Sequence, residues 1–188
     1  MRMLAAATLL AFALPVTAQE IDYDFVEAGL YYDEIDTGDF DVDGDGFRIA
    51  GSIELSPRWH AFTSYENLDF DFGVDVDTFE IGGGYHVPLV PDLDLVVELS
   101  YVTSDGRSGP IDFDDSGLAA SLGVRTMLLP ALEVAGFVDY VDLDDIRDDT
   151  MLRGETWYEW TPSIAFGASL EIGSDEVAFG FGARWYYQ

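Results

Sequence analysis

The sequence predicts an all-β fold, a closed antiparallel barrel of about ten strands, and three observations lead to that prediction. Apolar residues alternate with small or charged residues along most of the chain, long connections alternate with short ones, and the charged residues of the alternating segments share one face. A period of two is the pattern of a β-strand, and no stretch keeps the period of a helix.

Composition excludes several classes of protein. Of the 188 residues, 8 are basic, all of them arginine, and 37 are acidic, which gives a net charge of −29. Nucleic acid is excluded as a partner because phosphate binding needs a basic surface. With 48% hydrophobic and 14% aromatic residues, the chain is too apolar for a disordered acidic tail. It has no cysteine, hence no disulfide framework, thiolate metal site or cysteine nucleophile.

The N-terminus has the pattern of a secretory signal peptide. Arg2 is followed by an apolar run from Met3 to Val16, and Val16-Thr17-Ala18 has the small-x-small form of a cleavage site. The run is too short to span a bilayer comfortably. We therefore expect residues 1–18 to be removed on export and residues 19–188 to form one barrel domain. An N-terminal anchor helix is the alternative.

The strands follow from the alternation, taken in chain order. In residues 46–55, 93–103 and 176–187 the apolar face consists of the odd-numbered positions. Most segments are about ten residues long, the length of a tilted transmembrane β-strand. The expected strands are 21–32, 46–55, 59–67, 77–87, 93–103, 116–128, 131–141, 151–160, 163–172 and 176–187. Eight strands remain possible, because Trp157-Tyr158 breaks the alternation.

The connections between these strands fall into two classes that take turns. Long, acidic, glycine-rich or aspartate-rich loops cover 33–45, 68–76, 104–115 and 142–150, and a short one covers 173–175. The other connections are tight turns that carry Pro57, Pro88 and Pro91, Pro130, and Pro162. Proline suits a turn because it fixes φ and cannot donate to a strand ladder. Long loops at one end and short turns at the other are typical of an outer-membrane barrel, whose loops are extracellular and whose turns are periplasmic.

The two faces of the strands indicate the same environment. Ten charged residues fall on the face with the small side chains, and we expect them to line the lumen, as ion pairs or as a selectivity filter: Glu27, Arg48, Glu54, Glu80, Glu98, Arg125, Glu133, Arg153, Glu171 and Arg184. In the dry interior of a soluble barrel so many charges carry a large desolvation cost, whereas a wet lumen hydrates them. A periplasmic or secreted β-sandwich is the alternative.

Several segments resemble a family of small proteobacterial outer-membrane β-barrel proteins. They are Phe25–Gly29, Asp43–Phe47, Gly51–Pro57, Trp59–Phe62 and Phe179–Trp185. The resemblance implies a place in the cell outer membrane, with lipid and lipopolysaccharide around the barrel. The last strand, with alternating aromatic residues, also resembles the signal read by the barrel-assembly machinery, which is therefore an expected partner during biogenesis. These are motifs of the fold, and they carry no catalytic residues.

The residues available for catalysis are few. His60 and His86 are the two histidines, and both lie beside short turns, at the end expected to be periplasmic. Enzymes of the outer-membrane barrel type carry a histidine near the outer rim, and here a general base for neutral pH is missing there. We therefore expect no enzyme activity and no cofactor.

One segment resembles half of a calcium-binding loop. Residues 41–46 read D-x-D-x-D-G, the opening of an EF-hand loop, but the twelfth position is Ser52 where that loop needs a glutamate. This excludes an EF-hand and leaves weak calcium binding at Asp41, Asp43 and Asp45 as a hypothesis. The alternative is a solvated acidic loop.

The distribution of charge suggests two functions. The long loops carry more than half of the 37 acidic side chains, so this end attracts cations and repels anions. The first hypothesis is a narrow, passive, cation-preferring channel for small solutes. The second is a non-conducting barrel that acts in adhesion or envelope structure through its acidic loops, with divalent cations as possible bridges to lipopolysaccharide phosphates.

Overall fold

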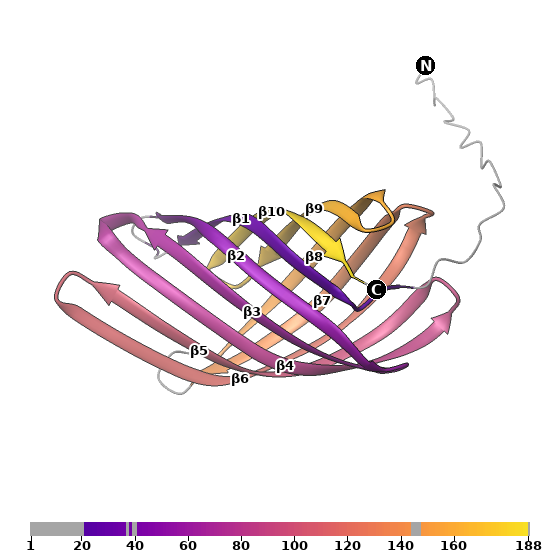
Figure 1. Ribbon diagram of the computed structural model, residues 1–188. Helices are drawn as coiled ribbons and strands as arrows, with labels where there is room; N and C mark the ends of the chain where they lie inside the picture. The colour runs from indigo at the N-terminus through magenta and orange to yellow at the C-terminus, as the bar shows by residue number, and fades with distance from the viewer. Residues whose placement is uncertain (1–20, 37, 39–40, 144–147, 188) are drawn as a thin grey trace, which may run out of the picture.

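Each strand pairs with the strand next to it in the chain, and β1 pairs with β10, so the sheet closes into a barrel (Figure 1). The computed structural model describes residues 21–36, 38, 41–143 and 148–187. All pairs are antiparallel. The strands are β1 (Phe25–Asp36), β2 (Asp41–Ser56), β3 (Trp59–Phe70), β4 (Val74–Val90), β5 (Leu93–Ser108), β6 (Ile111–Leu129), β7 (Leu132–Leu143), β8 (Asp149–Thr161), β9 (Ile164–Ile172) and β10 (Glu176–Tyr186). A short 3-10 turn, η1 (Asp71–Gly73), joins β3 to β4.

Four two-residue turns close one end of the barrel, which we call the turn end. They are Pro57-Arg58, Pro91-Asp92, Pro130-Ala131 and Pro162-Ser163. In each case the pairing register shifts by one residue just before the turn, as in a β-bulge. In each turn the backbone carbonyl of the second residue accepts a hydrogen bond from a backbone N–H of the strand that follows the hairpin in the chain. For example, His86 N of β4 donates to Arg58 O in the turn between β2 and β3, at 3.0 Å. This repeated unit joins neighbouring hairpins into a continuous rim.

The opposite end, which we call the loop end, corrects the predicted loop boundaries. The expected loops 33–45, 68–76 and 104–115 are mostly strand. In the first, β1 reaches Asp36 and β2 begins at Asp41; in the second, only η1 separates β3 from β4; in the third, β5 continues to Ser108. The alternation of Asp with Val or Gly in these segments still allows strand pairing. Gly38, Gly73 and Gly109 adopt positive φ where three of these hairpins reverse. Of the expected loop 142–150, residues 144–147 lie outside the described part.

The outer surface of the barrel is apolar. Large hydrophobic side chains are exposed on every strand, among them Leu30, Ile49, Leu99, Leu118, Leu122, Leu152, Phe166 and Phe181. Aromatic rings add to this surface near the turn end, where the rings of Trp59 and Tyr85 lie 4.8 Å apart. An apolar face toward the surroundings and a charged face inside are the arrangement of a barrel in lipid. None of the described residues forms a helix long and apolar enough to cross a membrane.

Glycines on the inner face receive the large side chains of neighbouring strands. A Cβ atom at Gly167 would lie 2.4 Å from the ring of Trp157, one at Gly123 would lie 2.3 Å from Phe137, and one at Gly84 would lie 2.2 Å from His60. Each glycine therefore leaves the space that an inward aromatic side chain occupies. The sequence indicated an inner face of small residues, and the space beside these residues is filled by larger side chains from the adjacent strands.

We predict that Gly167→Ala destabilises the barrel by about 2 kcal/mol, because the added methyl group overlaps both Trp157 and the backbone oxygen of Thr156. The matched control is Gly136→Ala, since nothing lies within 4 Å of a Cβ at that position, and its effect stays within about 0.5 kcal/mol. Urea unfolding of the protein refolded in lipid vesicles measures both. Equal effects of the two substitutions would contradict this account of the packing.

Candidate functional site

Among the residues that the structure describes, four arginines lie in the lumen, the space inside the barrel, and each is close to at least one carboxylate. Arg48 comes from β2, Arg125 from β6, Arg153 from β8 and Arg184 from β10. Each arginine lies within 4.0 Å of at least one carboxylate. Their partners lie on strands that are neighbours around the barrel, and also on strands two or three places apart around it.

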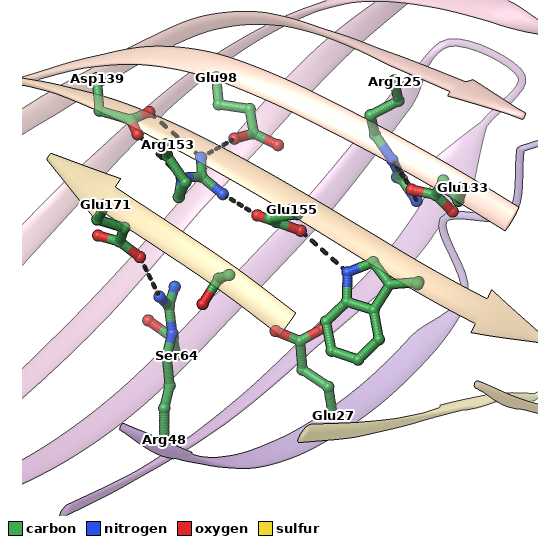
Figure 2. Close-up of polar contacts among 12 residues, drawn as sticks. Glu27, Arg48, Ser64, Glu98, Arg125, Glu133, Asp139, Arg153, Glu155 and Glu171 are labelled. Atoms are coloured by element: carbon green, nitrogen blue, oxygen red, sulfur yellow. Dashed lines mark hydrogen bonds and ion pairs between the residues drawn. The ribbon is translucent and has the colours of Figure 1, made fainter. Parts of the chain in front are cut away.

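The first group, which we call the Arg153 cluster, joins β5, β7 and β8. Arg153 donates from Nε to Asp139 Oδ2 at 2.9 Å and from Nη2 to Asp139 Oδ1 at 3.2 Å, a bidentate contact. Its Nη1 contacts Glu155, and its Nη2 lies 4.0 Å from Glu98 Oε2 (Figure 2). The guanidinium also lies 4.3 Å from the centre of the Phe137 ring. Arg153 is thus held by three carboxylates and one ring.

The second group, which we call the turn-end cluster, lies nearer the turn end. Arg184 donates to Glu27 Oε2 from Nε at 2.9 Å, and its Nη1 lies 3.8 Å from Glu133 Oε1. Arg125 lies 2.8 Å from the same oxygen of Glu133 through Nε and through Nη2. The side chains of Arg125, Glu133 and Arg184 are almost completely buried. One buried carboxylate therefore pairs with two buried arginines.

The two clusters are connected, because Arg184 Nη2 lies 3.5 Å from Glu155 Oε2. Glu98 of the Arg153 cluster also reaches β3, where its Oε1 lies 2.9 Å from His60 Nε2. Contacts between charged or polar groups therefore run without a gap across the lumen, from β3 to β6, through the residues His60, Glu98, Arg153, Glu155, Arg184, Glu133 and Arg125. Such a chain of contacts obstructs the lumen and ties together strands that do not share a ladder.

The third group, which we call the Arg48 cluster, is dominated by acids. Arg48 lies opposite Glu66 in the pairing of β2 with β3, and its Nη1 is 3.8 Å from Glu171 Oε1 (Figure 2). Glu80 accepts hydrogen bonds from Ser100 at 2.6 Å and from Ser64 at 3.3 Å. Three glutamates thus share the surroundings of a single arginine. The imbalance leaves negative charge in the lumen on the loop-end side of the turn-end cluster.

The residues before β1 also enter the lumen, at the turn end. Residues 21–24 are not strand, although the sequence placed them in the first strand, because their backbone joins no ladder. Tyr23 is 1% exposed, and its hydroxyl donates to Asp94 Oδ2 at 3.1 Å. Asp94 Oδ2 also lies 3.1 Å from His86 Nδ1. Both histidines of the chain therefore lie in the lumen and contact carboxylates.

The structure brings together nine of the ten charged residues that the sequence assigned to the lumen, in the clusters described above. Glu54 differs. It is exposed at the turn-end rim, where its backbone N–H donates to Asp24 Oδ1 at 2.6 Å. Glu54 lies beyond the end of β1, whose first residue Phe25 pairs with Ser52, although on its other side it still pairs with the inward His60 of β3.

The sequence analysis missed several residues of the network: Tyr23, Glu66, Asp139 and Glu155. Asp139 and Glu155 lie on inward positions that the alternation alone identifies. The signal was obscured at Trp157-Tyr158, where two successive aromatic residues were taken to break the alternation of β8. Trp157 instead faces inward and donates to Glu155 Oε2 at 3.1 Å, while Tyr158 faces outward, so the alternation is unbroken.

The proposed calcium ligands do not converge. Asp41, Asp43 and Asp45 occupy alternate positions of β2 on its outer face, within a regular strand and not in a loop. Alternate residues of a strand are about 6.6 Å apart, so the first and third of these aspartates are separated by about 13 Å. Among the described residues no group of three or more His, Cys, Asp or Glu side chains is arranged to hold a metal ion. A single calcium ion bound by all three aspartates does not fit this spacing, and weak calcium binding at Asp41, Asp43 and Asp45 stays a prediction.

Comparison with known proteins shows a likeness of fold. No protein-family model matches the sequence, and no curated protein matches it. Among solved structures, the KdgM porin is 9% identical, with 86% of this chain and 99% of that chain covered and a TM-score of 0.51. The β domain of the Bordetella autotransporter BrkA is 14% identical, with coverage of 88% and 100% and a TM-score of 0.53. The translocator domain of the autotransporter NalP from Neisseria meningitidis is 8% identical, with coverage of 90% and 91% and a TM-score of 0.51.

None of these three structures is described as an enzyme. At such low identity the likeness concerns the fold alone. Together with the apolar outer face, it supports a place in the outer membrane. The chain has the fold of an outer-membrane β-barrel.

We predict that Glu133→Gln destabilises the barrel by about 3 kcal/mol, because Arg125 and Arg184 both lose a buried counter-charge. The control is Glu54→Gln, which removes the same charge from an exposed position and changes stability by no more than about 0.5 kcal/mol. Urea unfolding in vesicles measures the difference. A similar small effect for both variants would show that water in the lumen compensates for the lost ion pairs.

Proposed function

We propose that the protein is a narrow, passive channel that admits small cations in preference to anions. The observation that carries the proposal is the excess of carboxylates in the lumen. In the Arg48 cluster, Glu66, Glu80 and Glu171 surround a single arginine. Acidic side chains around a narrow passage select cations, because the walls of low dielectric constant strengthen the field.

The loop end adds to the same field. Five aspartates and Arg107 line a depression of about 380 Å³ on β4, β5 and β6, together with Gly106 and Phe113: Asp75, Asp77, Asp105, Asp112 and Asp114. Exposed charges act over about 8 Å at physiological ionic strength. These aspartates occupy the outward positions of their strands, in line with the exposed Phe79, Tyr101 and Leu118. They therefore attract cations to the outside of the loop end, and discrimination between ions is left to the carboxylates of the lumen.

The likeness to the KdgM porin agrees with a channel, although at 9% identity it concerns the fold. The lumen sets a limit on what passes. Side chains fill much of it, and the contacts between His60 and Arg125 run across it. A solute must therefore be small, or the contacts must rearrange while it passes.

A second candidate function rests on that same obstruction. If the contacts across the lumen never open, the barrel conducts nothing, and the acidic loop end is the functional surface. The protein would then act in adhesion or in the structure of the envelope, through partners or divalent cations that bind its carboxylates. Conductance decides between the two.

We predict discrete cation-selective openings when the protein is refolded into a planar bilayer under a salt gradient. In the double variant Glu80→Gln/Glu171→Gln the reversal potential moves toward zero, because two lumenal carboxylates are lost while Arg48 remains. The matched control is Asp41→Asn/Asp43→Asn, which removes two charges from the outer face of β2 and leaves the reversal potential nearly unchanged.

The folded state of each variant is checked first by heat-modifiable migration in gel electrophoresis. Equal shifts for the two double variants would assign the selectivity to the general charge of the loop end and not to the lumen. Complete silence from folded wild-type protein would contradict the channel and favour the second candidate.

A further inference from the structure

The four residues that precede β1 occupy the turn end of the lumen. Tyr23 is 1% exposed and Ile21 is 7% exposed, although both come before the first strand. Ile21 and Tyr23 form one apolar cluster with Val96, Ala135 and Phe137, and Met127 packs against it. The segment therefore reaches the inner faces of β5, β6 and β7.

Tyr23 fits between four side chains, which we call the Tyr23 slot: His60, His86, Asp94 and Arg125. Its ring stacks on His60 at a centroid distance of 4.7 Å and lies 4.0 Å from His86. The guanidinium of Arg125 lies 4.3 Å from the ring centre. With the hydroxyl bound to Asp94, every part of the side chain is in contact.

The other half of the turn end is filled from the opposite wall. Trp157, Ala165 and Tyr186 form a buried cluster with Phe25 packed against it. Arg184 lies 4.1 Å from the Trp157 ring and 3.9 Å from that of Phe25. This wall belongs to strands β1, β8, β9 and β10 and cannot move without opening the sheet. Of the described residues that fill the turn end, those of segment 21–24 are therefore the ones that belong to no strand.

Few backbone contacts hold the segment. Arg125 Nη2 donates to the carbonyl of Asp22 at 3.2 Å, and Asp24 is tied to the rim through Tyr187 N, which donates to its carbonyl at 3.2 Å. Between these two points the segment is held by side chains. No strand pair includes residues 21–24, so departure of the segment with Asp24 as the pivot would leave every strand pair intact.

We propose that residues 21–24 form a stopper for the turn end of the lumen, and that solutes cross only while Tyr23 is out of its slot. This proposal rests on the proposed channel function and adds a regulated step to it. When Tyr23 leaves, Arg125 keeps Glu133 as its partner, so the open state contains no unpaired buried arginine. The stopper therefore opens without breaking the turn-end cluster.

The test uses two measurements on the refolded barrel, one of position and one of conduction. The chain has no cysteine, so Ile21→Cys introduces a unique thiol whose reaction with a maleimide reports whether the segment is inside. We expect slow labelling in the folded barrel. Adding Tyr23→Ala accelerates labelling about tenfold or more and raises the open probability of the channel by a similar factor, because ring contacts and a hydrogen bond are lost.

The matched control is Tyr187→Ala, which removes a tyrosine from the same rim but outside the slot; its hydroxyl binds Ser52 O at 2.7 Å. We expect neither the labelling of the introduced thiol nor the conductance to change by more than about twofold. If Tyr23→Ala does not fold, the pair Ile21→Cys/Val96→Cys replaces it, since both side chains belong to one cluster. Oxidation of that pair then abolishes conductance, and reduction restores it.

Three results would overturn the proposal. Labelling of the Ile21→Cys variant as fast in the folded barrel as in urea would show that the segment does not occupy the lumen. If the wild-type protein conducts with the same open probability as Tyr23→Ala, the stopper is disproved and the channel function stands. Faster labelling in Tyr23→Ala with silence from both proteins would disprove the channel, and the gating role with it.

Discussion

The ion pair between Arg184 of β10 and Glu27 of β1 lies directly across the seam that closes the barrel, because the two residues face each other in the register. A sheet of ten strands has two edges, and closure requires that the first and last strands pair in one register. Arg184 also contacts Glu133 and Glu155, so the seam is connected to β7 and β8. The network of the lumen therefore depends on the same register that closes the sheet.

The second constraint is volume. Closing ten strands creates an interior wider than the side chains of one strand can fill, so small residues alternate with large ones across neighbouring strands. Gly167 beside Trp157 and Gly123 beside Phe137 are two examples. The resulting lumen is filled by aromatic rings and ion pairs near the turn end, and by glutamates and serines around Arg48. This change in lumen-filling side chains along the barrel axis gives the barrel one obstructed end and one acidic end.

The proposed function and the proposed stopper follow from that change along the barrel axis. In the proposed channel, carboxylates around Arg48 attract cations into the barrel, and passage is limited by the side chains that fill the turn end. Most of the side chains that fill the turn end belong to strands, whereas Tyr23 is held by a slot of four side chains and takes part in no strand pair. In this proposal, ion selectivity depends on the carboxylates of the barrel wall, whereas opening depends on one short segment, residues 21–24.

The sequence by itself determined the number of strands, their two faces, the proline turns and most of the charged residues that face the lumen, because these depend on a period of two and on local backbone chemistry. It did not determine how far the strands extend at the loop end. Only the tertiary structure decided the partners. Arg184 contacts residues as distant in the chain as Glu27 and Glu155, and alternation specifies a face but not the register that brings such residues together. The inward position of Trp157 and the path of Tyr23 were hidden for a related reason: both aromatic residues fill space left by glycines or by neighbouring strands, and that space exists only after the sheet has closed.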